Sequence, residues 1–277
     1  MKPPPFEYVA PTSLEEALTA LAEHGEDAKV LAGGQSLIPL LSLRLARPTA
    51  LVDLNGVDEL SGVTVNGHVT LGATTRHRAV ERSADIARAV PLLAAAVPYI
   101  GHTAIRSRGT IGGSLAHADP AAELPAVALA LDATFEACST ARGSRTITAA
   151  DFFEGYFTTS LAPDEVLTRV TFPVAATGTK VSVEEMARRH GDFAMAAAMV
   201  QRDPDGRHRI ALVNVADRPV RATEAEQAAD AGADDREVAD LATRDLDPTA
   251  DLHATSAYRK HVAGVLVRRA LADIRSM

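Results

Sequence analysis

The sequence of 277 residues contains one cysteine, Cys138, and no tryptophan. One thiolate cannot form a disulfide within the chain, nor supply the four ligands of a cysteine-bound iron–sulfur cluster or structural zinc site. Any redox chemistry must therefore use a bound organic cofactor or electrons from another chain. We expect Cys138 itself to be a small apolar core residue at the end of a strand.

Basic residues are also scarce, because Lys and Arg total 28 against 36 Asp and Glu, for a net charge of −8. This balance argues against a nucleic-acid partner. The longest apolar stretches are interrupted by Pro91, Pro98, Pro120 and Pro125, and none approaches the roughly 20 residues of a membrane span. The N-terminus has no secretory pattern. We therefore expect a cytoplasmic protein without a membrane span.

The first third of the chain predicts a small α+β unit followed by a hairpin. Ser13 and Glu16 form a capping-box pattern that predicts a helix over 13–24. Short strands are expected over 28–34 and 49–54, with Ser36 capping a helix between them. Residues 62–72, GVTVNGHVTLG, alternate around an Asn-Gly pair, which predicts a hairpin with a type I′ turn.

The remaining segments continue the α+β pattern. Asp119 before Pro120 predicts the start of a helix that ends near Leu131. Beyond Pro173 the pattern indicates a hairpin around residues 204–206 and three amphipathic helices. Other expected elements are helices over 75–82 and 84–97 and strands over 132–138 and 165–173. We expect three parts, residues 1–56, 57–174 and 175–277.

Two glycine-rich loops are the candidate binding site. Gly33-Gly34 precede Ser36, and Gly112-Gly113 lie between Thr110 and Ser114. Exposed backbone N–H groups in such turns bind anions, and two of these turns can hold a pyrophosphate from both sides. Neither loop has an adjacent lysine, which argues against a transferable phosphate and favours a bound dinucleotide. The spacing differs from the G-x-G-x-x-G fingerprint.

Four stretches carry a family resemblance: LAGGQSLIPLLSLRLARPTALVDLN, AIRSRGTIGGSLAHADPAAELPAVALAL, FFEGYFTTSLAPDEVLTRVTFP and SAYRKHVAGVLVRRAL. Together they resemble the medium, FAD-binding subunit of the molybdenum hydroxylases, a group that includes carbon monoxide dehydrogenase and xanthine dehydrogenase. The resemblance implies a two-subdomain FAD-binding fold of the vanillyl-alcohol-oxidase (PCMH) type. Residues 1–56 and 57–174 would be the FAD-binding subdomains, and 175–277 a small α+β C-terminal flavoprotein domain.

The resemblance also implies which residues contact FAD. The first loop would hold the pyrophosphate, and the second the pyrophosphate and the adjacent ribityl or ribose. Glu123 aligns with the family's ribose-binding carboxylate, while Ile100 and Leu161 match apolar positions near the flavin or adenine. Glu185 stands where relatives often have a lysine, so no flavin contact is carried over there. The implied set is Leu31, Ala32, Gly33, Gly34, Gln35, Ser36, Leu37, Ile100, Gly109, Thr110, Ile111, Gly112, Gly113, Ser114, Asp119, Glu123 and Leu161.

The function implied by the resemblance is electron transfer. Electrons from 2Fe–2S clusters of a small partner subunit would pass through FAD on this chain to NAD, a quinone or oxygen. The molybdenum cofactor would lie on a large partner subunit. Gln35 replaces the histidine by which relatives in the wider fold often tether FAD, so the cofactor is expected to be non-covalent. No catalytic or metal-binding residue is expected in this chain.

Two alternatives remain open from the residues alone: a stand-alone FAD-dependent oxidoreductase of small molecules, and a non-enzymatic cofactor-binding scaffold. The roles of several polar residues near the loops are also undecided. His117 either seats a flavin phosphate or packs a turn. Tyr99 and His102 are expected to be a structural pair, and residues 74–79 a solvated helix start from which Thr75 can reach a cofactor.

Overall fold

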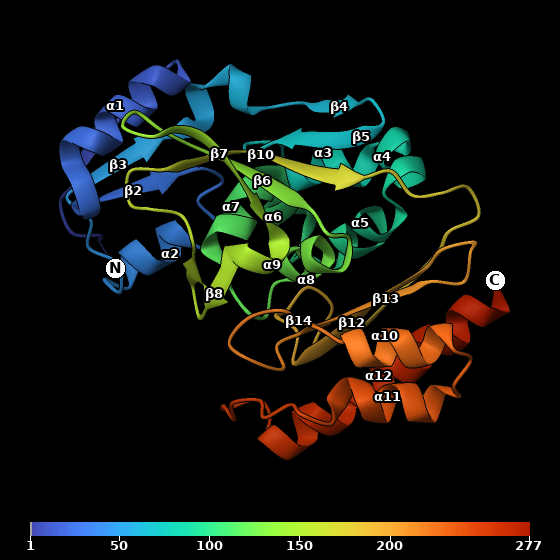
Figure 1. The fold of residues 1–277 in the computed structure, drawn as a ribbon. Helices are drawn as coiled ribbons and strands as arrows, with labels where there is room; N and C mark the ends of the chain where they lie inside the picture. The colour runs from blue at the N-terminus through green and yellow to red at the C-terminus, as the bar shows by residue number, and fades with distance from the viewer. Residues whose placement is uncertain (1) are drawn as a thin grey trace.

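The computed structural model describes residues 2–277, which form four layers in Figure 1. A three-stranded parallel sheet, in the order β1-β3-β2, begins the chain. Parallel neighbours need crossover connections, and two helices provide them. The elements of this part are β1 (Glu7–Val9), α1 (Leu14–His24), β2 (Ala28–Leu31), α2 (Leu37–Ser42) and β3 (Ala50–Asp53), with short 3₁₀ turns at Gly25–Asp27, Leu54–Gly56 and Asp58–Leu60.

The predicted first helix is confirmed, with a small change in its cap. The Ser13 hydroxyl accepts a hydrogen bond from the Glu16 N–H at 3.2 Å. The Glu16 carboxylate accepts from the N–H of Thr12, at 2.7 Å, instead of that of Ser13. Ala17 and Leu21 of α1 are buried against the parallel sheet. This packing fixes the strand that leads into the first glycine segment.

The second sheet is antiparallel, in the order β4-β5-β10-β6-β7. The predicted hairpin is confirmed, but its turn is not type I′. That turn needs a positive φ at both central residues, and here Gly67 has φ +68° while Asn66 does not have a positive φ. The strands are β4 (Val63–Val65), β5 (His68–Gly72), β6 (Thr134–Ser139), β7 (Gly143–Thr148) and β10 (Val166–Pro173).

A layer of short helices covers one face of the second sheet (Figure 1). The helix expected over 84–97 breaks at Val90, because Pro91 begins a new helix. The elements of this layer are α3 (His77–Arg82), α4 (Ala84–Ala89), α5 (Pro91–Ala96), a 3₁₀ turn at Val97–Tyr99, α6 (Thr103–Arg108), α7 (Ile111–His117), α8 (Glu123–Ala130) and α9 (Ala149–Phe152). After α9 the chain forms a separate two-stranded sheet of β8 (Phe153–Gly155) and β9 (Thr158–Thr159).

The helix expected from Pro120 begins three residues later. Asp119 accepts a hydrogen bond from the Ala121 N–H at 2.9 Å, which closes a turn before α8. Helix α8 is then buried on nearly all sides, since it lies between the second sheet and the third. Its burial brings Glu123, at its first position, into the protein interior.

The third sheet, in the order β11-β12-β13-β14, packs on these helices with one face and on three further helices with the other. The hairpin at residues 204–206 and the three amphipathic helices are confirmed. The bounds are β11 (Lys180–Met186), β12 (Ala196–Arg202), β13 (His208–Val213), β14 (Val220–Arg221), α10 (Thr223–Asp230), α11 (Asp235–Thr243) and α12 (Ser256–Ser276).

The expectation that Cys138 lies in the core is wrong. Cys138 is half-buried, and its Sγ lies 3.9 Å from the Thr168 hydroxyl. Side chains alternate across a strand, so its neighbours Phe135 and Ala137 on β6 face the helices and Cys138 faces away. Across residues 2–277, no helix combines the length and the apolar character that crossing a bilayer requires.

Candidate functional site

The structure brings the two glycine segments, residues 31–37 and 109–114, into backbone contact. A Cβ placed on Gly33 would lie 2.4 Å from the Arg108 carbonyl oxygen and 2.8 Å from the Gly109 Cα. A Cβ on Gly113 would lie 3.5 Å from the Ala32 Cβ. These distances leave no room for a side chain at Gly33. Segments separated by more than 70 residues therefore share one surface.

The first segment is a turn between β2 and α2. Leu31 ends β2, and Gly34 has φ +74°, a conformation that favours glycine. The Gln35 amide donates to the Gly33 carbonyl at 3.0 Å. Ser36 takes the N-cap position of α2, which begins at Leu37, but its hydroxyl makes no capping bond. The predicted Ser36 cap is thus wrong.

The second segment is not a loop, as its glycines lie within the first turn of α7. Thr110 is the N-cap, and its hydroxyl accepts from the Gly113 N–H at 3.1 Å. Gly112 packs on the preceding part of the chain, because a Cβ there would lie 2.4 Å from the Ala73 Cβ. Glycine is needed here for close packing, and the N–H groups of Ile111 and Gly112 donate to the carbonyls of Thr75 and Ala73 at 3.0 and 2.8 Å. Ile111 is buried and Ser114 half-buried.

An arginine and an asparagine connect the two segments, and sequence reasoning missed both. Arg76 donates from Nη2 to the Asn55 side-chain oxygen at 2.5 Å and from Nη1 to the Arg108 carbonyl. Asn55 in turn donates from Nδ2 to the Ala32 carbonyl at 2.8 Å. The TTRHRA stretch was the available signal, but only the fold shows that Arg76 reaches both segments.

Residues 74–79 are therefore not the solvated helix start that the sequence suggested. His77 is buried, and its Nε2 lies 2.9 Å from the Thr110 carbonyl, so this nitrogen must carry the proton. Burial lowers the pKa of His77 to about 4. Thr75 is also buried, and its hydroxyl donates to the Gly62 carbonyl at 2.9 Å. His77 bonds the Thr110 carbonyl, and the Thr75 carbonyl accepts from the Ile111 N–H, so both residues hold the backbone of the second segment.

Ile100 is held by a buried arginine. Arg106 pairs with Glu81, with nitrogen–oxygen distances of 3.1 and 3.0 Å, and this pairing lowers the pKa of Glu81. The Arg106 Nη1 also donates to the carbonyls of Ile100 and Gly101, at 3.1 and 2.9 Å. The half-buried Ile100 and Leu161 both pack against the central core.

Glu123 is a buried carboxyl at the contact between α8 and the third sheet. Burial first, and then the charges of Glu185 and Asp119, raise the pKa of Glu123 to about 8. Burial also raises the pKa of Glu185 to about 7, and the Glu185 Oε2 has no hydrogen-bond partner. Burial of these two carboxyls in a low-dielectric position destabilises the fold, a pattern that favours a functional role.

The remaining polar candidates make structural contacts. The His117 ring lies 5.1 Å from that of Phe157, and burial lowers its pKa. Tyr99 donates to the Val183 carbonyl at 3.1 Å. His102 is exposed next to Gly191, where a Cβ would lie 2.8 Å from the His102 Nδ1. Within residues 2–277, no group of three His, Cys, Asp or Glu side chains is arranged to hold a metal.

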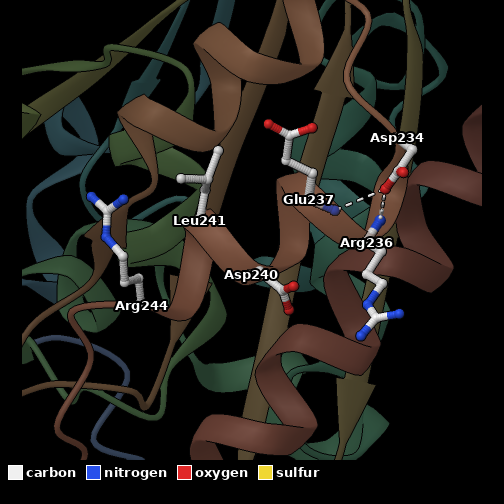
Figure 2. A pocket seen from close by; sticks show the side chains of 6 residues that line it. All are labelled: Asp234, Arg236, Glu237, Asp240, Leu241 and Arg244. Carbon is white, nitrogen blue, oxygen red and sulfur yellow. Dashed lines mark hydrogen bonds between the residues drawn. The ribbon is translucent and has the colours of Figure 1, made fainter.

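Two hollows of the described chain lie away from the glycine segments. Figure 2 shows one of about 370 Å³ along the outer side of α11, lined by Asp234, Arg236, Glu237, Asp240, Leu241 and Arg244. Asp234 caps this helix by accepting from the N–H groups of Arg236 and Glu237. A smaller hollow of about 170 Å³ lies near the end of β10 and includes Gln201 and Arg209. Neither contains a residue of the implied set.

The contact between the glycine segments fits an extended dinucleotide. Residues 31–37 and 109–114 contain no acidic side chain, and the cations Arg76 and Arg108 lie beside them. Gly33 is buried in the contact, while Gly34 and Gly113 are half-buried beside it, where a phosphate can approach the backbone closely. A pyrophosphate bound beside the contact would meet the positive charge of the two arginines, while the nearby carboxylate of Asp53 accepts hydrogen bonds from Tyr8 and Asn55.

Comparisons with family models, curated proteins and solved structures all point to the same family. A family model described as the FAD binding domain in molybdopterin dehydrogenase matches residues 4–175, and one described as the CO dehydrogenase flavoprotein C-terminal domain matches residues 181–274. The chain is 42% identical to the 6-hydroxypseudooxynicotine dehydrogenase complex subunit alpha of Paenarthrobacter nicotinovorans, over 98% of this chain and 95% of that one.

The chain is 38% identical to the carbon monoxide dehydrogenase medium chain of Hydrogenophaga pseudoflava, over 98% of this chain and 97% of that one. A solved structure of carbon monoxide dehydrogenase from that organism superposes with a TM-score of 0.95 over 100% of this chain and 99% of that one, at 38% identity. Quinoline 2-oxidoreductase from Pseudomonas putida 86 gives a TM-score of 0.92 at 37% identity, over 100% and 99%. The predicted α+β fold of the vanillyl-alcohol-oxidase type, with a C-terminal α+β part, is confirmed.

Replacing Gly33 with alanine tests the contact between the segments. The new Cβ lies 2.4 Å from a backbone oxygen, so the segments must separate by about 1 Å to reach ordinary contact near 3.4 Å. We expect FAD affinity to fall about tenfold or more, with circular dichroism of the apoprotein unchanged. Gly264→Ala on α12 is the control, because its Cβ would have nearest neighbours at 3.7 Å. Unchanged FAD affinity in Gly33→Ala would contradict the assigned role of this contact.

Glu123→Gln tests the buried carboxyl through the pH dependence of stability. The unfolded chain ionises Glu123 near its ordinary pKa of 4.5, whereas the folded chain keeps the proton up to about pH 8. Stability is therefore lost as pH rises from 4.5 to 8, and glutamine removes this loss. The variant should melt at a higher temperature than wild type at pH 8, and with no such gain at pH 4. Glu26→Gln, at an exposed turn, controls for the change in net charge. Equal gains at both pH values would show that Glu123 is not buried as a carboxylic acid.

Proposed function

The chain belongs to the FAD-binding medium subunits of the molybdenum hydroxylases, and on that premise we propose that its two glycine segments form one site for the FAD pyrophosphate. The chain is an FAD-dependent oxidoreductase subunit that transfers electrons. The observation that carries the proposed site is the contact of Gly33 with the Arg108–Gly109 backbone. An anion bound at the surface beside this contact would meet both segments.

Each part of the proposed site would contact a different part of FAD. Residues 31–37 hold the pyrophosphate, and residues 109–114 hold the pyrophosphate and the adjoining ribityl or ribose. Glu123 accepts from a ribose hydroxyl near Asp119, and Ile100 and Leu161 pack against the flavin or the adenine. FAD, when bound, supplies a carrier that accepts and releases electron pairs. The chain's own residues bind and orient this carrier and exclude water from it.

The proposed division into FAD-binding subdomains 1–56 and 57–174 and a C-terminal domain 175–277 is supported by the sheets. The strands of the parallel sheet fall within 1–56, those of the five-stranded sheet within 57–174, and those of the third sheet within 175–277. The joint core of the second and third parts gives the chain a rigid frame on which to orient the cofactor.

We propose that the chain works in a cytoplasmic complex with a small iron–sulfur subunit and a large molybdenum-cofactor subunit. The names "complex subunit alpha" and "medium chain" of its relatives support a multi-subunit assembly. A single cysteine also means that the chain depends on a partner for any cysteine-bound cluster. The acceptor is proposed to be NAD, a quinone or oxygen.

Electron transfer from a partner is favoured over direct oxidation of a small molecule by this chain. The relatives named above are subunits of multi-subunit dehydrogenases, which supports electron transfer from a partner. A stand-alone oxidoreductase needs a substrate cavity with a titratable base over the flavin. The buried Glu123 and the half-buried Glu185 have raised pKa values, which gives this second function its one specific support.

Flavin absorbance under anaerobic conditions separates the two functions. The isolated FAD-loaded chain should bleach with dithionite but not with aldehydes, N-heterocycles or carbon monoxide. Adding the iron–sulfur and molybdenum subunits should restore bleaching by the substrate of the complex. Stoichiometric bleaching of the isolated chain by an organic substrate would contradict the electron-transfer function and support the stand-alone oxidoreductase.

A further inference from the structure

We propose that Arg76 is a positioning residue whose guanidinium holds the two glycine segments at the separation that the FAD pyrophosphate requires. The inference rests on the proposed function of those segments. It assigns Arg76 and its partner Asn55 a role that is not part of the implied set of FAD contacts.

The backbone around Arg76 belongs to the second segment. Arg76 and Thr110 form an antiparallel bridge. The His77 N–H donates to the Gly109 carbonyl at 3.0 Å, and the Ile111 N–H donates to the Thr75 carbonyl at 3.0 Å. These bonds fix the Cα of Arg76 relative to residues 109–111. Truncating its side chain therefore leaves the second segment supported.

The side chain of Arg76 reaches the first segment through Asn55. Its Nη2 donates to the Asn55 Oδ1 at 2.5 Å, and the Asn55 Nδ2 donates to the Ala32 carbonyl at 2.8 Å. The Nη1 donates to the Arg108 carbonyl, the group that a Cβ on Gly33 would strike. One guanidinium thus binds the Arg108 side of the contact directly and the first segment through Asn55.

Asn55 is itself held in a fixed orientation. Its N–H donates to the Asp53 carboxylate at 2.9 Å, and the other oxygen of that carboxylate accepts from the Tyr8 hydroxyl at 2.6 Å. Because the Asn55 amide nitrogen is used by Ala32 and Asp53, its oxygen is left to accept from Arg76. The link therefore extends from β1 and β3 of the parallel sheet to the second segment.

The charge of Arg76 also suits a bound anion. Arg76 is half-buried, and among residues 2–277 it has no carboxylate within ion-pair distance. Burial and the nearby charge of Arg108 lower the pKa of Arg76, and the charge of Asp53 offsets part of this shift. A pyrophosphate bound at the two segments would stabilise the positive charge of Arg76. Lysine cannot substitute fully, because a single ammonium lacks the planar fork that binds two acceptors in fixed directions.

The test is FAD affinity of the full-length chain, measured by quenching of flavin fluorescence on apoprotein prepared from each variant. Arg76→Ala should bind FAD about tenfold to hundredfold more weakly than wild type, as expected for loss of charge-assisted hydrogen bonds. Asn55→Ala should weaken binding in the same direction. The double variant should be no weaker than Arg76→Ala, since both residues act in one link. Arg82→Ala, which removes an exposed arginine at the end of α3, should bind as wild type does.

Two readouts separate positioning from other roles. The far-UV circular dichroism spectrum of the Arg76→Ala apoprotein should match that of Arg82→Ala, which would exclude loss of the fold. Arg76→Lys should recover only part of the affinity. Full recovery by lysine would show that Arg76 acts as a charge alone and would overturn the positioning role, as would wild-type affinity in Arg76→Ala. A wild-type chain that fails to bind FAD would overturn the proposed function and this inference together.

Discussion

The structure depends on one close approach, the contact between the backbone of Gly33 and that of Arg108 and Gly109. Gly33 follows a strand of the parallel sheet, and Gly109 precedes a helix that covers the antiparallel sheet. Because a Cβ at Gly33 would lie 2.4 Å from a backbone oxygen, the two parts can meet here only through glycine. The hydrogen bonds of Arg76 and Asn55 then stabilise the same contact. A cofactor with a pyrophosphate at its centre is suited to a site assembled in this way.

The sheets and helices behind the contact form a shared core, and this core buries two carboxyls at a cost in stability. Helices α5 and α8 pack against the second sheet on one side and the third sheet on the other, so the second and third parts share a core (Figure 1). The same packing buries Glu123 and half-buries Glu185, whose carboxyls are held partly protonated at neutral pH. Such burial opposes folding. A carboxyl buried at this cost at the start of α8 fits the proposed role of Glu123 in binding the cofactor.

The sequence was sufficient for much of the fold and for the approximate place of the site, because those signals are local. Helix α1, the hairpin at Gly67 and the two glycine pairs all show in short windows of residues. The failures concern contacts between distant residues. Thr110 caps the turn that contains Gly113, which converts an expected loop into a helix start. Arg76 reaches Asn55, 21 residues away, and Arg108, 32 residues away. The position of Glu185 opposite Glu123 depends on the side of the third sheet that faces α8, and no local pattern specifies it.

The most direct test of the central claim is amide hydrogen exchange of the apoprotein with and without FAD. If the two glycine segments form one pyrophosphate site, FAD should slow exchange in residues 31–37 and in residues 109–114 together, with similar dependence on FAD concentration. Exchange along α11, beside the hollow in Figure 2, should not change. Slowing in only one of the two segments, or at α11 in place of both, would contradict the account.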